Sequence, residues 1–220
     1  MRKAIAVDVE PQPKPRSHLK AMIADVLNHE VPAHVTWIYC FGGITAFLFM
    51  IQAVTGFLLW LYYKPAPAQA YQSVQDFVFK FPFGWLFRSI HRWAANGMVF
   101  MVIVHMLRVF LTGSYKTPRQ LNWVIGMVLL LLTFGFAVTG FLLPWDQQAY
   151  WVTNEFIHVV QSLPLAGSML AAILKGGPQV GAATLTRFFT FHVYVLPAII
   201  VVFLGAHFVI IRKQGISGPL

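Results

Sequence analysis

The sequence predicts an all-α membrane protein, a four-transmembrane-helix bundle with short helices in its outer-side loops. The first observation is composition: 58% of the 220 residues are hydrophobic and only 10% are charged, which is too apolar for a soluble domain. The second is a set of four apolar windows, each near the roughly 20 residues that a spanning helix needs. These windows are about residues 35–63, 93–111, 121–143 and 189–211.

The third observation is a pair of long outer-side loops, about residues 64–90 and 144–188. They contain helix-like pieces such as VTNEFIHVVQSL, so we expect them to pack over the bundle. Residues 1–20 form a polar, Pro-rich tail that does not resemble a signal peptide. The pattern LKAMIADVL, which begins in this tail, suits the inner membrane surface. Residues 21–220 are expected to form one transmembrane domain.

The basic residues predict the orientation. With an even number of spans both termini share one side, and that side carries nine Lys and Arg against six on the other, which favours cytoplasmic termini. The net charge of +9 therefore reflects topology first and anionic membrane lipid second. Nucleic acid is not expected as a partner, because no basic run is interleaved with a reading surface.

Two pairs of histidines lie within the apolar windows. His91 and His105 are 14 residues apart, so in an α-helix their directions differ by about 40° and their heights by about 21 Å. His192 and His207 are 15 apart, which gives about 60° and about 22 Å. Both helices start on the outer side, so His91 should meet His192 near the outer surface and His105 should meet His207 near the inner one.

Two facing imidazoles at one depth suit bis-His ligation of a haem iron. Zinc or copper usually takes a third or fourth protein ligand, whereas a porphyrin supplies four nitrogens itself. We therefore expect the bundle to enclose two stacked b-type haems. The histidines outside this geometry are interpreted as surface or interfacial residues: His18, His29, His34 and His158.

Glycine pairs repeat the histidine spacing. Gly42 and Gly56 in the first window, and Gly126 and Gly140 in the third, are again 14 residues apart. A missing side chain at each depth would let a macrocycle edge approach the backbone. Glycine also serves ordinary helix packing in membranes, but two pairs in step with the histidines favour the haem interpretation.

Four arginines are candidate partners of the haem propionates. Arg88, Arg92 and Arg187 lie within one or two turns of the outer histidines, and Arg108 lies three residues after His105. An arginine within a span is costly without a partner. Snorkelling to the interface explains Arg88 and Arg187 about equally well, and it explains Arg108 less well.

Several motifs, taken in order, resemble the b6-type branch of the cytochrome b family, the four-helix half of a split cytochrome b. They run from about Ala21 to Leu220: VPAHV, YCFGGIT, FGWLFRSIHRW, HMLRVFLTGSYKTPRQLNW, VTGFLLPWDQ, TLTRFF and RKQGISGPL. The 15-residue spacing of the second histidine pair points the same way, because the unsplit mitochondrial type typically has 14. Residues 1–20 do not match the plant or cyanobacterial pattern.

The resemblance implies a subunit of a proton-translocating quinol:cytochrome c (or plastocyanin) oxidoreductase. One quinol electron would pass to a Rieske iron–sulfur protein, and the other would cross from the outer to the inner haem and on to a quinone. The implied partners are a subunit IV-like C-terminal half, the Rieske protein and a c-type cytochrome, in a homodimeric complex. The PEWY segment of the outer quinol site is absent here, so the chain is not expected to be complete alone.

The resemblance also implies particular sites. On the inner side, Asp25 and Arg212 would lie beside a quinone pocket, with ordinary interfacial charges as the alternative. Cys40 within YCFGGIT would hold an extra c-type haem through one thioether bond, and the alternative is a small buried hydrophobe. Chlorophyll and carotenoid are left open. Near the outer quinol site the resemblance places Phe136, Gly140, Pro144, Trp145 and Asp146.

Two other functions share some of these features. A dihaem membrane anchor of a hydrogenase or formate dehydrogenase would have the same paired histidines, but Cys40 and the LPWDQ turn argue against it. A transporter with histidines as proton relays would show no reducible haem band. The expected location is a bacterial cytoplasmic membrane, with the thylakoid membrane as the alternative.

Overall fold

The computed structural model describes residues 17, 20, 24 and 33–218. Asp25 and most of the LKAMIADVL pattern lie outside the described residues. The chain divides after residue 35, and residues 36–220 form one compact unit. Within its described residues, this unit contains helices and connecting loops but no strand.

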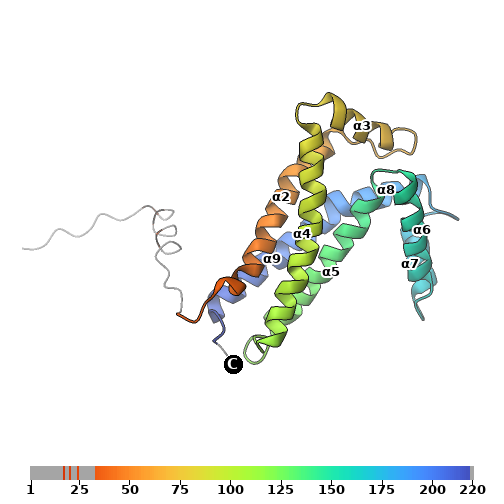
Figure 1. The fold of residues 1–220 in the computed structure, drawn as a ribbon. Helices are drawn as coiled ribbons and strands as arrows, with labels where there is room; N and C mark the ends of the chain where they lie inside the picture. The colour runs from red at the N-terminus through yellow and green to blue at the C-terminus, as the bar shows by residue number, and fades with distance from the viewer. Residues whose placement is uncertain (1–16, 18–19, 21–23, 25–32, 219–220) are drawn as a thin grey trace, which may run out of the picture. The chain divides into compact units, whose positions relative to one another are not determined.

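Within the described part of the chain, four helices are long and apolar enough to cross a membrane: Trp37–Tyr62, Gly84–Leu111, Gln120–Leu142 and Ala182–Gln214. The first comprises the short η1 (Trp37–Cys40) and α2 (Phe41–Tyr62), and the next two are α4 (Gly84–Leu111) and α5 (Gln120–Leu142). Within this bundle α2 packs mainly on α4, and α5 packs mainly on α9 (Leu196–Gln214), the main part of the fourth span. Figure 1 shows these two helix pairs, and the predicted four-helix fold is confirmed.

The fourth span is composite. It joins α8 (Ala182–Thr190), the wide turn η2 (Phe191–Val195) and α9 (Leu196–Gln214) into one continuous helix. The Leu196 N–H bonds to the Phe191 carbonyl five residues back, which is the π-helical pattern. Pro197 has no N–H to donate, so the ordinary α-helical ladder is already interrupted at this point.

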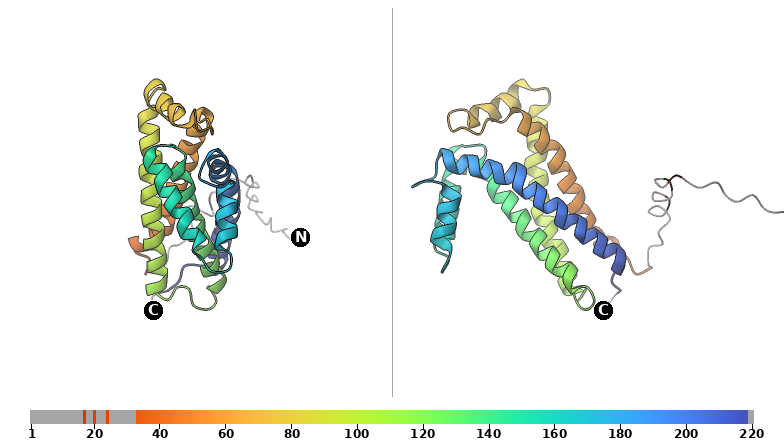
Figure 2. Two further views of the ribbon diagram at one scale, coloured as in Figure 1. Left: turned by 90° about the vertical axis from the view of Figure 1, so that its right-hand side faces the viewer. Right: turned by 180° about the vertical axis from the view of Figure 1, so that it is seen from behind.

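The predicted outer-side helices are present. They are α3 (Ala70–Lys80), α6 (Gln147–Gln161), α7 (Gly167–Lys175) and the start of the fourth span, and they gather at one end of the bundle (Figures 1 and 2). A fully buried apolar cluster joins α3, the end of α5 and α8: Ala70, Leu142, Leu185 and Phe188. Tyr63 adds a polar link, because its hydroxyl donates to the Leu143 carbonyl at 2.7 Å. Burial raises the pKa of this hydroxyl, which keeps it protonated as a donor.

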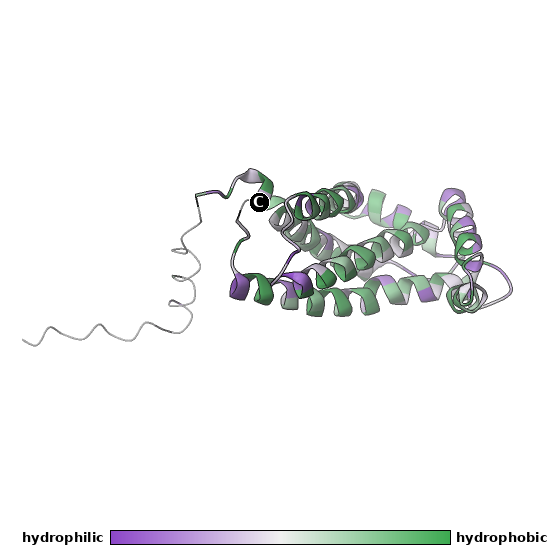
Figure 3. Ribbon diagram, turned by 90° about the horizontal axis from the view of Figure 1, so that it is seen from below, coloured by the Kyte–Doolittle hydropathy of each residue, from purple (hydrophilic) through white to green (hydrophobic). Residues whose placement is uncertain are grey.

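Large apolar side chains point outward along the spans. Examples are Phe47 (66% exposed), Phe100 (64%), Leu131 (65%) and Val202 (69%). Figure 3 shows the same long apolar stretches, with polar residues concentrated towards the helix ends. An apolar surface of this extent is what lipid tails require, because water is absent from the bilayer core.

Candidate functional site

The outer histidines face each other across the bundle. His91 of α4 and His192 of η2 have ring centroids 6.4 Å apart and planes inclined by 71°. A metal ion bonded at about 2 Å to one nitrogen of each ring would take up about 4 Å of that separation. The pair therefore has room for one metal ion with two imidazole ligands, as in a bis-His haem. Gln52 of α2 anchors α4 here, because its Nε2 donates to the His91 carbonyl at 2.7 Å.

The inner histidines form the second pair. They are His105 of α4 and His207 of α9, and Gly126 lies against both His207 and Met106, the residue that follows His105 in α4. His105 lies against Gly42 of α2, and His207 lies against Gly126 of α5. The structure therefore brings together the same two pairs that the sequence spacing predicts.

Each of the four glycines faces one of the four imidazoles. A Cβ atom built on the glycine would contact the Cε1 atom of one ring in every case. This correspondence is one to one, with α2 glycines facing α4 histidines and α5 glycines facing histidines of the fourth span. The sequence predicts only that glycines and histidines lie at the same depths, so these individual contacts are a more specific result than the prediction. The distances from Cβ to Cε1 are 3.1 Å for Gly56 and His91, 2.9 Å for Gly42 and His105, 2.6 Å for Gly140 and His192, and 3.8 Å for Gly126 and His207.

Two threonines that the histidine and glycine spacing does not single out contact the outer rings. Thr55 Oγ1 lies 2.8 Å from Nδ1 of His91, and Thr139 Oγ1 lies 3.0 Å from Nδ1 of His192. Each threonine directly precedes the glycine that faces the same ring. The signal that could have found them is a repeated heptapeptide, AVTGFLL, at residues 53–59 and again at 137–143.

The protons of both hydroxyls are already committed to their own helix. Thr55 Oγ1 donates to the Ile51 carbonyl at 2.7 Å, and Thr139 Oγ1 donates to the Gly135 carbonyl at 2.7 Å. A hydroxyl has one proton, so each oxygen accepts from the imidazole and Nδ1 carries the ring proton. Nε2 is then the unprotonated nitrogen that can bind a metal. The outer pair therefore fits a metal ligand set in its protonation as well as in its spacing.

The wide turn η2 accounts for the 15-residue spacing of the second pair. His192 lies within this turn, and a π-type turn takes more residues than an α-helical turn. The extra residue is absorbed there, so His192 and His207 keep nearly the register of a 14-residue spacing. The expected difference in direction of about 60°, which assumes a uniform α-helix, is therefore an overestimate.

The candidate propionate arginines have different surroundings. Arg88 and Arg92 line a recess of about 370 Å³ on α4, beside the outer histidine level. Arg108 has its Cζ 3.6 Å from the centre of the Tyr39 ring, and its Nε and Nη2 are buried without a hydrogen-bond partner. A buried cation without an anion fits the carboxylate of a propionate close to the inner pair.

Arg187 is engaged elsewhere. Its Nη1 donates to the carbonyls of Ala172 and Ile173 in the last turn of α7, where a cation is favourable. Gly176 ends that helix at φ 70°, and a Cβ there would lie 2.6 Å from Cζ of Arg187. This arrangement favours a structural role for Arg187 in holding α7 to α8, a role that the sequence does not predict.

The residues expected near the outer quinol site lie in two separate places. Phe136 packs in the interior, with ring centroids 6.4 Å from Phe49 and 5.4 Å from His192. The turn at residues 144–146 instead joins α5 to α6. Its Asp146 caps α6, because Oδ1 accepts a backbone N–H of that helix at 2.8 Å.

Of the residues expected beside the c-type haem and the inner quinone pocket, the structure describes two. Cys40 is exposed at the junction of η1 and α2, two residues before the glycine that faces His105. Arg212 is exposed in the last turn of α9. Asp25 lies outside the described residues, so the inner quinone pocket stays a prediction.

Among the described residues, no group of three or more His, Cys, Asp or Glu side chains is arranged to hold a metal ion. The histidine pairs are two-ligand sites, which a porphyrin completes with its own nitrogens. Fold and site together define a class of protein: a four-span membrane bundle with two histidine pairs facing each other at two depths.

Comparison with known proteins narrows that class. The family model Cytochrome b/b6/petB matches residues 26–215. The chain is 51% identical to cytochrome b6 of Synechococcus elongatus over 205 residues, which covers 93% of this chain and 95% of that protein. It is 49% identical to cytochrome b6 of Mastigocladus laminosus over the same coverage. The chain therefore belongs to the cytochrome b/b6 family and is an integral membrane protein.

A solved structure agrees with this assignment. A chain of a hyperthermophilic respiratory complex III superposes with a TM-score of 0.84 at 34% sequence identity. The match covers 93% of this chain and 55% of that one, so this chain spans about half the length of that structural neighbour. The family implies b-type haem, which the histidine pairs fit.

Proposed function

We propose that the chain is the electron-transfer subunit of a b6f/bc-type quinol:cytochrome c (or plastocyanin) oxidoreductase, in which electrons cross the membrane from an outer to an inner b haem. The observation that carries the proposal is the one-to-one pairing of four glycines with four histidines at two depths. Family membership supports it, because the cytochrome b6 relatives cover nearly the whole chain.

The residues of the chain have distinct parts in this function. Bound haem supplies one-electron redox chemistry. His91 and His192 would hold the outer haem through Nε2, and His105 and His207 the inner one. The glycines keep the ring faces clear of side chains, and Arg108 would neutralise a propionate. The apolar spans exclude water between the two levels and so separate the two redox centres from solvent.

The proposal extends to both membrane surfaces. Cys40 would bind a c-type haem through a thioether, beside an inner quinone pocket that includes Asp25 and Arg212. The turn at 144–146 would contribute to an outer quinol site completed by a subunit IV-like C-terminal half. A Rieske protein and a c-type cytochrome would accept the other electron, and quinol turnover on opposite faces would translocate protons. A bacterial cytoplasmic membrane with cytoplasmic termini remains the proposed location.

Isolation of the complex through an affinity tag on this chain tests the proposal. We expect a Rieske protein and a three-helix membrane partner to co-purify, with b-type bands that quinol reduces. Co-purification of hydrogenase or formate dehydrogenase subunits would contradict the assignment, and absence of any reducible haem would contradict electron transfer altogether.

The covalent haem has a separate test. A thioether survives denaturation, whereas bis-His ligation does not, so the denatured 24.8 kDa chain should stain for haem on a gel. Cys40→Ala should abolish the stain while both b haems remain in the native spectrum. A wild-type chain that does not stain would return Cys40 to a small apolar side chain.

A further inference from the structure

We propose that Thr55 and Thr139 are positioning residues that fix the outer histidines for iron binding and lower the reduction potential of the outer haem. The inference rests on the proposed function and goes beyond it, because it assigns the direction of electron flow to two hydroxyl groups. They belong to the repeated segment AVTGFLL and contact Nδ1 of His91 and His192 at 2.8 Å and 3.0 Å.

The contact has a defined polarity. Because each hydroxyl donates its proton to a carbonyl four residues back, it can only accept from Nδ1–H. An imidazole that donates from its second nitrogen becomes a more basic metal ligand. A more basic axial ligand stabilises ferric over ferrous iron, so the potential of the haem falls. Both His91 and His192 are made more basic ligands in this way.

The inner pair has no threonine at the corresponding positions. The residues before the inner glycines are Phe41 and Ile125, which carry no hydroxyl. No hydroxyl contacts Nδ1 of His207; this atom makes no hydrogen bond of ordinary geometry, and the acceptor beside the ring is the backbone carbonyl of Asn122. The axial ligands are therefore polarised at the outer level and less so at the inner level. This difference makes transfer from the outer to the inner haem favourable, which is the direction that the proposed function requires.

The test is a spectroelectrochemical titration of both b components in the isolated complex. Thr55→Val and Thr139→Val remove each hydroxyl with little change of shape, and His91→Leu identifies the outer component by its loss. We expect each valine variant to raise the reduction equilibrium constant of the outer haem about threefold to tenfold, tenfold being 59 mV for one electron. The inner component should not move, and Thr→Ser at either position should restore the wild-type value.

Thr133→Val is the matched control. Thr133 is a buried threonine of α5 that donates to the Leu129 carbonyl four residues back at 2.9 Å, as Thr139 does to its own helix, but it contacts no histidine in the described hydrogen bonds. Both potentials should stay unchanged in this variant. An equal shift in Thr133→Val, or an unchanged outer potential in both variants of the proposed pair, would overturn the inference.

The remaining outcomes are also informative. Selective loss of the outer haem in Thr55→Val, with recovery by serine, supports the pairing, because Nδ1 of His91 then no longer has the acceptor that keeps Nε2 unprotonated. The ring of His192 keeps the Phe136 backbone as a second acceptor in Thr139→Val, so this variant should retain the outer haem more readily. Loss of both haems, or loss that serine does not repair, would count against it. Absence of bis-His haem from the wild-type complex would instead contradict the proposed function itself, so the two failures are distinguishable.

Discussion

Gly140 and His192 approach each other so closely that a Cβ atom on the glycine would lie 2.6 Å from Cε1 of the imidazole. Gly126 holds the corresponding place at the inner level, yet a Cβ there would lie 3.8 Å from Cε1 of His207, at ordinary contact distance. The outer level of the bundle is therefore packed more tightly against its α5 glycine than the inner level.

The difference predicts unequal effects of the same substitution. Gly140→Ala should displace the His192 ring and remove most of the outer b component, because a Cβ at 2.6 Å is not tolerated without movement. Gly126→Ala is the matched control and should retain both components. Difference spectra of the reduced and oxidised complexes measure both. Equal losses in the two variants would show that glycine serves only general helix packing.

A second glycine prediction concerns the end of α7. Gly176→Ala should destabilise this helix by more than about 1 kcal/mol, because the residue has φ 70°, which costs other residues roughly 1–2 kcal/mol. The added Cβ would also displace the Arg187 guanidinium. Faster amide exchange in residues 167–175 is the expected result. Gly177→Ala is the control, since its Cβ would meet no atom closer than 3.9 Å. Similar exchange in both variants would contradict the role given to Arg187.

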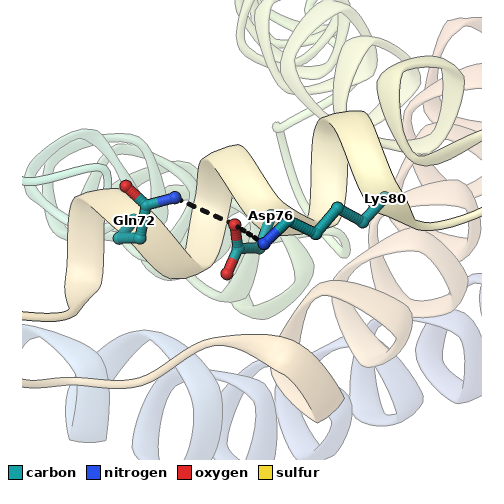
Figure 4. Close-up of polar contacts among 3 residues, drawn as sticks. All are labelled: Gln72, Asp76 and Lys80. Atoms are coloured by element: carbon teal, nitrogen blue, oxygen red, sulfur yellow. Dashed lines mark hydrogen bonds and ion pairs between the residues drawn. The ribbon is translucent and has the colours of Figure 1, made fainter.

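On the outer helix α3, the carboxylate of Asp76 makes pH-sensitive polar contacts with Gln72 and Lys80, as Figure 4 shows. Asp76 Oδ1 lies 2.8 Å from Lys80 Nζ and accepts from Gln72 Nε2 at 2.9 Å. The hydrogen bond from Lys80, then that from Gln72, lowers the pKa of Asp76 below its ordinary value of 3.8. These contacts therefore contribute fully to the stability of α3 above pH 3.8. Their contribution is lost as the pH falls through the lower pKa that Asp76 has in the folded state.

Lys80→Met tests this assignment, because it removes the larger cause and should move the pKa of Asp76 back towards its ordinary value. Carboxyl NMR titration of the protein in detergent measures the shift, with Lys64→Met as the control for a more distant cation. A pKa of Asp76 that is unchanged in Lys80→Met would show that the contact between Asp76 and Lys80 does not persist in solution.

Hydropathy predicts the number of spans correctly, because long apolar runs have few other uses than crossing a bilayer. It places the start of α4 too late. Arg88, His91 and Arg92 lower the mean hydropathy there, although the helix already begins at Gly84. A spanning helix can begin in the polar interface, and a hydropathy window does not detect that part.

The histidine and glycine pairing is predictable because both follow the period of one helix face. The threonines do not follow from that period, since their role depends on which neighbouring helix faces them. The wide turn at His192 also depends on tertiary packing. Arg187 is close in sequence to His192, which suggests a cofactor contact, whereas in space its guanidinium lies at the end of α7.

The most direct test of the central claim is a redox titration of the isolated complex in which single histidines are replaced by leucine. The wild type should show two b-type components. His91→Leu and His192→Leu should both lose one of them, His105→Leu and His207→Leu should both lose the other, and the exposed His158→Leu should lose neither. A variant of the four that keeps both components at wild-type potentials, or a loss of different components in His91→Leu and His192→Leu, would contradict the proposed pairing.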